Sequence, residues 1–134
     1  MKPTFKAQPV QVQVPASSAN LGPGFDCLGL ALNMNDRYMA QVMDEPGVDI
    51  DVTGEGAESI PTTDKNLVIK AMYKGFDFLG GRPRGISLRQ LNVIPHGRGL
   101  GSSAAAIVGG LALSRALVLG GNERMSNEDM LNIA

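Results

Sequence analysis

Apolar and polar positions alternate near the start of the chain and adopt a helical spacing further along. Val10–Val14 reads V-Q-V-Q-V and Val48–Val52 reads V-D-I-D-V. A period of two is typical of a strand with one buried face. Short apolar runs between turn residues predict further strands at Cys27–Leu32, Arg37–Met43 and Ile86–Ile94.

The last of these runs changes phase along its length. Ile86 and Leu88 fall on one face, whereas the next apolar pair, Leu91 and Val93, falls on the other. The apolar pattern thus slips in phase at 89–91, within a segment that is still predicted to be a strand.

The first predicted helix follows Thr63 or Asp64, either of which is a suitable N-terminal cap. Apolar residues at 67, 68, 71, 72, 76 and 79 share one face, while most lysines of this segment point away from it. Gly80-Gly81 is expected to end the helix.

Two more helices are predicted towards the end of the chain. Ser102–Leu119 is apolar almost all round and is expected to be buried, with Gly120-Gly121 after it. Ser126 opens the last helix, and Asp129 three residues later resembles a capping box. The chain is strand-rich at its start and helix-rich at its end, which predicts a single α+β domain built as an α/β two-layer structure.

The chain has 134 residues, 43% of them apolar, which is the size of one domain with a core of its own. The 17 glycines and 8 prolines exceed average usage, which is about 7% for Gly and about 5% for Pro. This surplus predicts tight turns and places where the backbone approaches a ligand closely.

Twelve basic and 13 acidic residues give a net charge of −1, so nucleic acid or an anionic membrane is not expected as a partner. A single cysteine, Cys27, excludes internal disulfides and fits a reducing compartment. The longest apolar stretch, Ala104–Leu113, is shorter than the roughly 20 residues of a membrane span. We therefore predict a cytoplasmic protein.

A glycine-rich stretch lies between the last predicted strand and the second large helix. It consists of Pro95, His96, Gly97, Arg98, Gly99, Leu100, Gly101, Ser102, Ser103, Ala104 and Ala105. Alternate glycines let the backbone approach an anion, and the helix that follows offers unpaired N–H groups and the positive end of its dipole. The hydroxyls of Ser102 and Ser103 are suited to capping the helix, bonding a phosphate oxygen or ligating Mg²⁺. We call 95–101 the phosphate loop.

Three other interpretations of the phosphate loop compete with this one. A Walker A loop requires a lysine that this segment lacks. Gly99-x-Gly101-x-x-Ala104 fits the dinucleotide fingerprint, but that fold requires a strand with a terminal acidic residue after the helix, and Gly120-Gly121 leads into another helix instead. A plain glycine-rich connection with serine caps stays open on spacing alone.

The pattern P-x-x-x-G-L-G-S-S-A-A at Pro95–Ala105 resembles the second motif of the GHMP kinases, a superfamily that contains galactokinases, homoserine kinases, mevalonate kinases and phosphomevalonate kinases. The resemblance implies a fold like the second domain of ribosomal protein S5, with ATP and Mg²⁺ as cofactors. It implies that this loop wraps the nucleotide phosphates, with Ser103 as Mg²⁺ ligand and Ser102 as phosphate contact, although the two serines could exchange roles. His96 is expected to be a bystander and Arg98 to be exposed.

The segment V-P-A-S-S-A-N-L-G-P-G-F-D at Val14–Asp26, followed by G-L-A-L, resembles the homoserine kinases, as does D-K-N-L-V-I-K-A at Asp64–Ala71. The resemblance implies that Asp26 binds the ammonium of L-homoserine and Asn20 its hydroxyl or carboxylate. Asp26 is also the one candidate base, with orientation of the substrate as its expected role. Asn66 is expected near the adenine. The alternatives are turn-forming roles for Asp26 and Asn20 and a helix-start role for Asn66.

The implied reaction transfers phosphate from ATP to L-homoserine, a step towards threonine, in a full-length protein expected to form a homodimer. Residues 1–134 are expected to be the N-terminal, ATP-binding domain of such a kinase. A C-terminal domain, with an acidic Mg²⁺ ligand and a third motif, is expected beyond Ala134, so that 1–134 alone is expected to have little activity. The alternatives are another GHMP kinase and a non-catalytic S5-like binding module.

Overall fold

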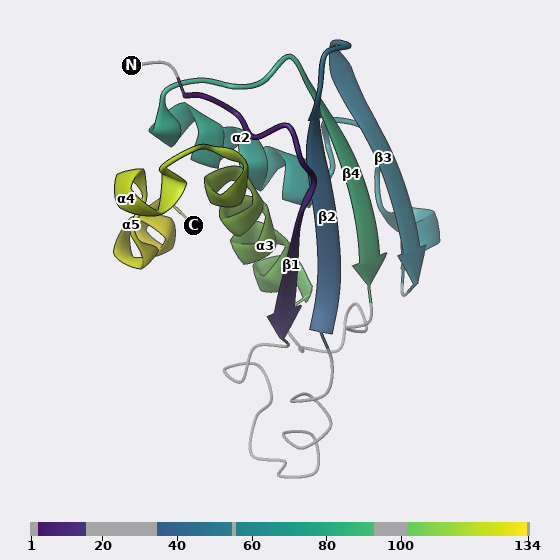
Figure 1. The fold of residues 1–134 in the computed structure, drawn as a ribbon. Helices are drawn as coiled ribbons and strands as arrows, with labels where there is room; N and C mark the ends of the chain where they lie inside the picture. Colours follow the sequence, from purple (N-terminus) through teal and green to yellow (C-terminus); the bar gives the residue numbers. More distant parts are fainter. Residues whose placement is uncertain (1–2, 16–34, 55, 93–101, 134) are drawn as a thin grey trace, which may run out of the picture.

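A computed structural model describes residues 3–15, 35–54, 56–92 and 102–133. They form a four-stranded sheet in the order β1-β2-β4-β3 (Figure 1). The pairs β1–β2 and β2–β4 are antiparallel and β3–β4 is parallel. The strands are β1 (Val10–Pro15), β2 (Asn35–Met43), β3 (Gly47–Gly54) and β4 (Gly85–Asn92). The predicted strand Cys27–Leu32 lies outside the described residues.

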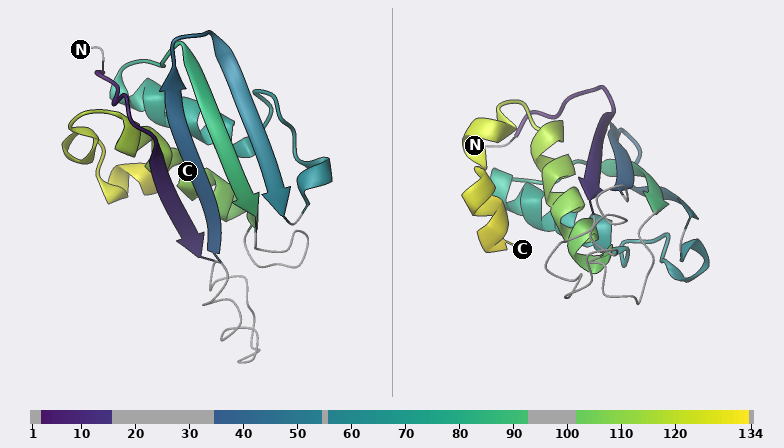
Figure 2. Two further views of the ribbon diagram at one scale, coloured as in Figure 1. Left: turned by 45° about the vertical axis from the view of Figure 1, so that its right-hand side comes forward. Right: turned by 90° about the horizontal axis from the view of Figure 1, so that it is seen from below.

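The helices pack on one face of the sheet and leave its other face uncovered among the described residues (Figure 2). α2 crosses over between the parallel strands β3 and β4, and α3 lies beside it (Figure 1). The two-layer α/β architecture is thus confirmed. The helical elements are η2 (Ala57–Ser59), α2 (Leu67–Leu79), α3 (Ser102–Leu117), α4 (Gly121–Arg124) and α5 (Asn127–Ile133).

The start of α2 differs from the sequence prediction. Its cap is Asn66, whose Oδ1 accepts hydrogen bonds from the backbone N–H groups of Val68 (2.8 Å) and Ile69 (3.4 Å). Thr63 instead forms the turn before the helix, since its carbonyl accepts from the N–H of Asn66 at 2.9 Å. The predicted end is confirmed: Gly80 follows the helix with a left-handed φ of 112°.

The end of the chain contains one helix that the sequence did not predict. α3 stops at Leu117, before the predicted Leu119, and the short helix α4 follows. The capping box of α5 is confirmed, because Ser126 Oγ accepts from the Asp129 N–H at 3.0 Å and Asp129 Oδ2 accepts from the Ser126 N–H at 2.9 Å.

The predicted strand is confirmed as β4, which keeps a regular alternation of buried and exposed positions through the phase slip at 89–91. Ile86, Leu88 and Gln90 all face the helices and are buried, and Asn92 continues the series with 2% of its surface exposed. Leu91, on the opposite face from Ile86 and Leu88, lies on the uncovered side of the sheet and is 38% exposed. The apolar pattern changes phase in the sequence because two amides, Gln90 and Asn92, occupy core-facing positions of a regular strand.

α3 packs against both α2 and the sheet, and glycines set how closely it does so. A Cβ on Gly110 would lie 2.5 Å from the carbonyl oxygen of Val68 in α2, and one on Gly109 would lie 2.3 Å from the ring of Tyr38 in β2. On α2, Gly75 lies against Ser114 of α3 in the same way, since its Cβ would lie 1.9 Å from Ser114 Oγ. The predicted burial of α3 is confirmed for most of its described length, with Leu111, Leu113 and Leu117 among its buried side chains.

Replacing Gly110 with alanine is expected to destabilise the fold although alanine is the better helix former. The new methyl group would overlap Val68 O and the Ala71 Cβ, which lies at 2.6 Å, so that the two helices must separate. Overpacking of this kind costs about 1–3 kcal/mol of unfolding free energy, measured by urea denaturation. Gly81→Ala is the matched control, because its Cβ would meet only Pro3 at an ordinary 3.5 Å. Equal stability of the two variants would contradict the close approach.

Candidate functional site

The two loops for which the sequence predicts function leave the sheet at the same end. β1 ends at Pro15 and β2 begins at Asn35, and these two residues are register partners. β4 ends at Asn92, next to the start of β2, since Leu91 pairs with Arg37. Residues 16–34 and 93–101 therefore both connect elements at this end, which we call the loop end of the sheet (Figure 1).

Most predicted site residues lie outside the described part of the chain. This applies to Asn20, Asp26, Pro95, His96, Gly97, Arg98, Gly99, Leu100 and Gly101. Ser102, Ser103 and Ala104 form the first turn of α3 at the loop end, and Ala105 behind them is buried. The contacts predicted for these residues stay predictions. The position of the α3 N-terminus directly after the phosphate loop, however, is as the sequence predicted.

Five side chains with polar groups are buried beneath the loop end, and only Asn66 among them was expected from the sequence. Each is at most 6% exposed, and the members are Asp36, Tyr38, Asn66, Gln90 and Asn92. Asp36 and Tyr38 lie on β2, Gln90 and Asn92 on β4, and Asn66 caps α2. The available signal was the pair Gln90 and Asn92, which continue the series of Ile86 and Leu88 on one face of the predicted strand Ile86–Ile94. Buried polar groups at such positions need hydrogen-bond partners, so they mark a specific structure.

The three amides of this set are connected to one another. Asn66 Nδ2 donates to the carbonyl oxygen of Pro61 (3.0 Å) and to Gln90 Oε1 (3.1 Å). Gln90 Nε2 in turn donates to Asn92 Oδ1 at 3.0 Å. Together with the two helix N–H groups bound to its oxygen, Asn66 uses all of its hydrogen-bonding groups within the protein. The helix-start role of Asn66 is therefore established, while its expected contact with adenine stays a prediction.

Asp36 and Tyr38 form a second buried pair, in which the Tyr38 hydroxyl donates to Asp36 Oδ2 at 3.1 Å. Burial raises the pKa of the Tyr38 hydroxyl, and the negative charge and hydrogen bond of Asp36 raise this pKa further. Tyr38 therefore remains a neutral donor throughout the physiological range. Asp36 is 1% exposed and also makes contacts beyond this pair.

A cavity of about 190 Å³ opens beside the buried polar set. Its lining residues come from the segment before α2, from the starts of β2 and α2, from the end of β4 and from α3: Asp36, Ser59, Ile60, Pro61, Lys65, Asn66, Leu67, Gln90, Asn92 and Ala106. Apolar walls with a few amide and carboxylate groups are typical of a small-molecule pocket. We call this the loop-end cavity.

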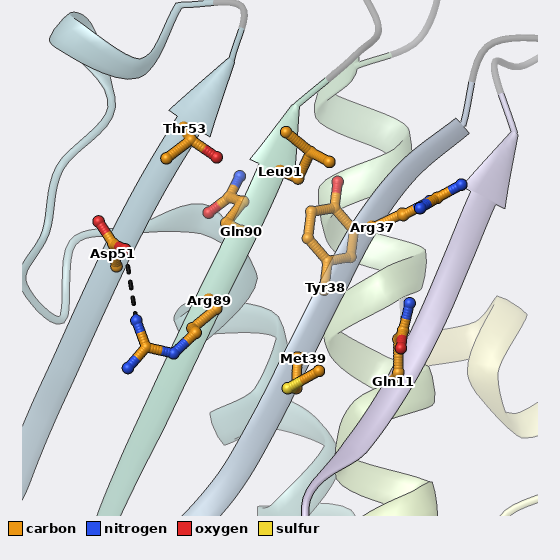
Figure 3. A pocket seen from close by; sticks show the side chains of 9 residues that line it. All are labelled: Gln11, Arg37, Tyr38, Met39, Asp51, Thr53, Arg89, Gln90 and Leu91. Carbon is orange, nitrogen blue, oxygen red and sulfur yellow. Dashed lines mark hydrogen bonds and ion pairs between the residues drawn. The ribbon is translucent and has the colours of Figure 1, made fainter.

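A second hollow, of about 220 Å³, lies on the uncovered face of the sheet (Figure 3). Arg89 and Asp51 form an ion pair there at 3.3 Å, with both side chains about two-thirds exposed. Such exposed pairs contribute little to stability, and the hollow lies on the opposite face from the helices. It is therefore not part of the candidate site.

The described residues contain no group of three or more His, Cys, Asp or Glu side chains arranged to hold a metal ion. No helix in the described segments is long and apolar enough to cross a membrane.

The family model described as the GHMP kinases N terminal domain matches residues 66–134. Among curated proteins, the homoserine kinase of Streptomyces coelicolor is 49% identical over 132 residues, which are 98% of this chain and 42% of that protein. The homoserine kinase of Mycobacterium tuberculosis is 48% identical over 106 residues, covering 79% of this chain and 33% of that protein. The chain thus spans less than half the length of these relatives.

Solved structures show the same fold. The homoserine kinase of Cytophaga hutchinsonii superposes with a TM-score of 0.72 at 29% identity, over 97% of this chain and 40% of that one. The mevalonate kinase of Methanococcus jannaschii gives a TM-score of 0.66 at 15% identity, over 96% of this chain and 45% of that one, which supports the fold alone.

Removing the Tyr38 hydroxyl is expected to destabilise the fold, because Asp36 would lose a donor inside the protein. Hydrogen bonds to charged groups are worth about 1.5–3 kcal/mol, so Tyr38→Phe should lower the unfolding free energy by about that amount in urea denaturation at pH 7. Tyr73→Phe is the matched control: Tyr73 is half-buried, and its ring, which the variant keeps, stacks under Arg82 at 4.3 Å. A Tyr38→Phe variant as stable as this control would show that the bond is not needed.

The same pair predicts a dependence on alkaline pH. A raised pKa in the folded state means that the contribution of Tyr38 is complete below the unfolded value of about 10 and is lost as the pH rises above it. The unfolding free energy of the unaltered protein should therefore fall as the pH rises above about 10, and fall less in Tyr38→Phe.

Proposed function

We propose that this chain, which belongs to the GHMP kinase family, contributes the ATP-binding domain of a homoserine kinase. The observation that carries the proposal is the 49% identity to a homoserine kinase along 98% of the chain, which includes both predicted loops. Attachment of these loops at one end of the sheet supports it, because a phosphoryl donor and its acceptor must meet in a single site. The homoserine kinase motif at Val14–Asp26 lies in the first of the two loops.

The reaction forms a bond between the homoserine hydroxyl oxygen and the γ-phosphorus of ATP. The bond from this phosphorus to the β,γ-bridging oxygen breaks, ADP leaves, and the hydroxyl proton is released. Such transfers depend mainly on in-line placement and on neutralising the charge of the phosphates. We assign placement to Asp26, which would bind the substrate ammonium, and to Asn20, which would bind its hydroxyl or carboxylate.

The phosphates would lie against the phosphate loop and the first turn of α3. This turn presents backbone N–H groups and the positive end of a 16-residue helix. Ser102 would contact phosphate, and Ser103 is our candidate ligand for Mg²⁺, which neutralises phosphate charge when bound. Few protein ligands are needed, because Mg²⁺ commonly takes one or two from the protein and the rest from phosphates and water. A single serine ligand at the start of α3 would be compatible with Mg²⁺ held mainly by phosphates and water.

We assign the loop-end cavity to the nucleotide base. Ile60, Leu67 and Ala106 supply apolar surface on which a planar ring can stack, and Lys65 lies at the exposed rim. The cavity also adjoins the end of β4, from which the phosphate loop departs. Base and phosphates would then be held on either side of Asn92.

The full-length protein is expected to release ADP from Mg-ATP when L-homoserine is present. Mevalonate and galactose are the matched acceptors for the alternative that it is another GHMP kinase. ADP release with either of these, and none with homoserine, would overturn the substrate assignment. Tight, salt-sensitive RNA binding without kinase activity would favour the S5-like binding module instead.

Within this assay, Asp26→Asn is expected to lower kcat/KM for homoserine at least a hundredfold, because an interaction with the substrate ammonium is lost. Ser103→Ala should mainly lower kcat. An unchanged kcat/KM in the Asp26 variant would remove this residue from the site.

Leu67→Glu tests the assignment of the base. Leu67 is the first residue of α2 and is 38% exposed, so a carboxylate there suits the helix dipole while occupying the cavity. We expect the KM for ATP to rise about tenfold or more, with the KM for homoserine little changed. Leu119→Glu, at a 54% exposed leucine outside the cavity, is the control. An unaltered KM for ATP in Leu67→Glu would place the base elsewhere.

A further inference from the structure

The buried amides of Asn66, Gln90 and Asn92 form a chain of hydrogen bonds to which the proposed function assigns no role. We call this chain the amide relay. It runs from Asn66, the cap of α2, to Gln90 of β4 and then along this strand to its last residue, Asn92. The exposed fractions of its members are 0%, 6% and 2%.

The relay has one polarity, and the helix sets it. Asn66 Oδ1 must face α2, because it accepts from the N–H groups of Val68 (2.8 Å) and Ile69 (3.4 Å). Its Nδ2 group therefore points the other way, to the carbonyl of Pro61 and to Gln90 Oε1. Reversing this amide would place an oxygen against two acceptors and an NH₂ group against two donors.

The same constraint passes along to Gln90 and Asn92. Gln90 Oε1 accepts from Asn66, so the Nε2 group of Gln90 faces Asn92. Asn92 Oδ1 accepts the hydrogen bond from this group at 3.0 Å. The orientation of Asn92 is thereby fixed, with Nδ2 as the donor group at the end of the relay. Asn92 ends β4, lines the loop-end cavity and lies three residues before Pro95.

We propose that the amide relay is a positioning device for the nucleotide: it sets the orientation of Asn92 at the root of the phosphate loop and couples it to the start of α2, which lines the base cavity. Gln90 is the positioning residue, since it bonds both other amides, although its side chain also lines the loop-end cavity. This inference rests on the proposed function, because it concerns how the same site holds ATP. Buried hydrogen-bond chains of fixed direction transmit such constraints, because each bond polarises the next.

Gln90→Glu tests the direction of the hydrogen bonds in the amide relay, because it replaces the NH₂ group that donates to Asn92 by an oxygen. When ionised, the new carboxylate would still accept from Asn66, but its second oxygen would face Asn92 Oδ1, so that Asn92 is driven to turn round. When protonated, the new carboxyl group would donate to Asn92 and restore the direction of the relay. Gln90 is only 6% exposed, and burial of this degree raises the pKa of a carboxyl group by several units, so the switch should fall near neutral pH instead of at the usual value of about 4.3.

The charged groups around this site act on the same equilibrium. Asp36 of β2 lines the cavity and opposes ionisation, and Tyr38, the register partner of Gln90 on β2, stays neutral. Lys65, before α2, is exposed at the rim and favours ionisation. On β3, the register partner of Gln90 is Val52, and α3 contributes Ala106 to the cavity, so neither side chain adds charge.

The experiment measures the Kd of the full-length protein for ATP, without acceptor, between pH 6 and pH 8.5. Gln90→Glu should bind ATP about tenfold or more weakly than the unaltered protein at pH 8.5 and recover most of this loss at pH 6. Gln90→Met removes the relay without introducing a titratable group, so its loss should not vary with pH. Gln13→Glu, at an exposed position of β1, is the control and should match the unaltered protein throughout.

The outcomes separate this inference from the proposed function. Weakening of Gln90→Glu that is equal at all pH values, or that follows only the fraction of protein unfolded in thermal melts, would overturn the relay as a positioning device. So would unaltered ATP affinity at pH 8.5. Because the measurement needs no acceptor, a protein that binds ATP with this pH pattern but does not phosphorylate homoserine would refute the substrate alone. Failure of the unaltered protein to bind ATP would overturn both.

Discussion

The close approach of α3 to its neighbours is the constraint on which the rest of the arrangement depends. Gly110 brings α3 against the backbone of α2, and Gly109 brings it against the ring of Tyr38 in the sheet. These contacts fix where the helix begins, because a helix of 16 residues seated at its middle behaves as one rigid body. Its N-terminus, on which the proposed phosphate contacts depend, is therefore positioned by packing about two turns away.

The same packing explains why buried polar groups are concentrated at one end. Towards the far end of the layer, Phe76, Leu79 and Leu117 fill the space between helices and sheet. At the loop end the space is shared by Asp36, Tyr38 and the amide relay, and a cavity remains. Buried amides and carboxylates need all of their hydrogen bonds, and these bonds are directional. The loop end therefore buries less apolar surface, but its side chains have fixed orientations.

Local patterns in the sequence predicted most of the fold but little of this polar interior. The alternation of Val48–Val52, the capping box at Ser126 and the end of α2 at Gly80 each depend on neighbouring residues, and each was predicted correctly. The cap of α2 is Asn66 and not Thr63, and the amide of Asn66 also bonds Gln90, 24 residues away, which no local pattern shows. Gln90 was not identified from the sequence, because its burial depends on a hydrogen bond to Asn66, 24 residues away in the chain. The two functional loops were recognised from their sequence motifs, which indicate the chemistry of the residues but not their positions in space.

The alternation of β4 also has a consequence for how the sheet is assembled. This strand is bonded on both sides, to β2 and to β3, so its alignment fixes that of its two neighbours. A slip by one residue would turn Gln90 and Asn92 out to water and drive Arg89 into the interior, where its charge has no partner. Gln90 and Asn92 thus select the alignment of the strands, because the observed alignment buries both amides with their hydrogen bonds made. The same alignment brings the two functional loops to the same edge of the sheet.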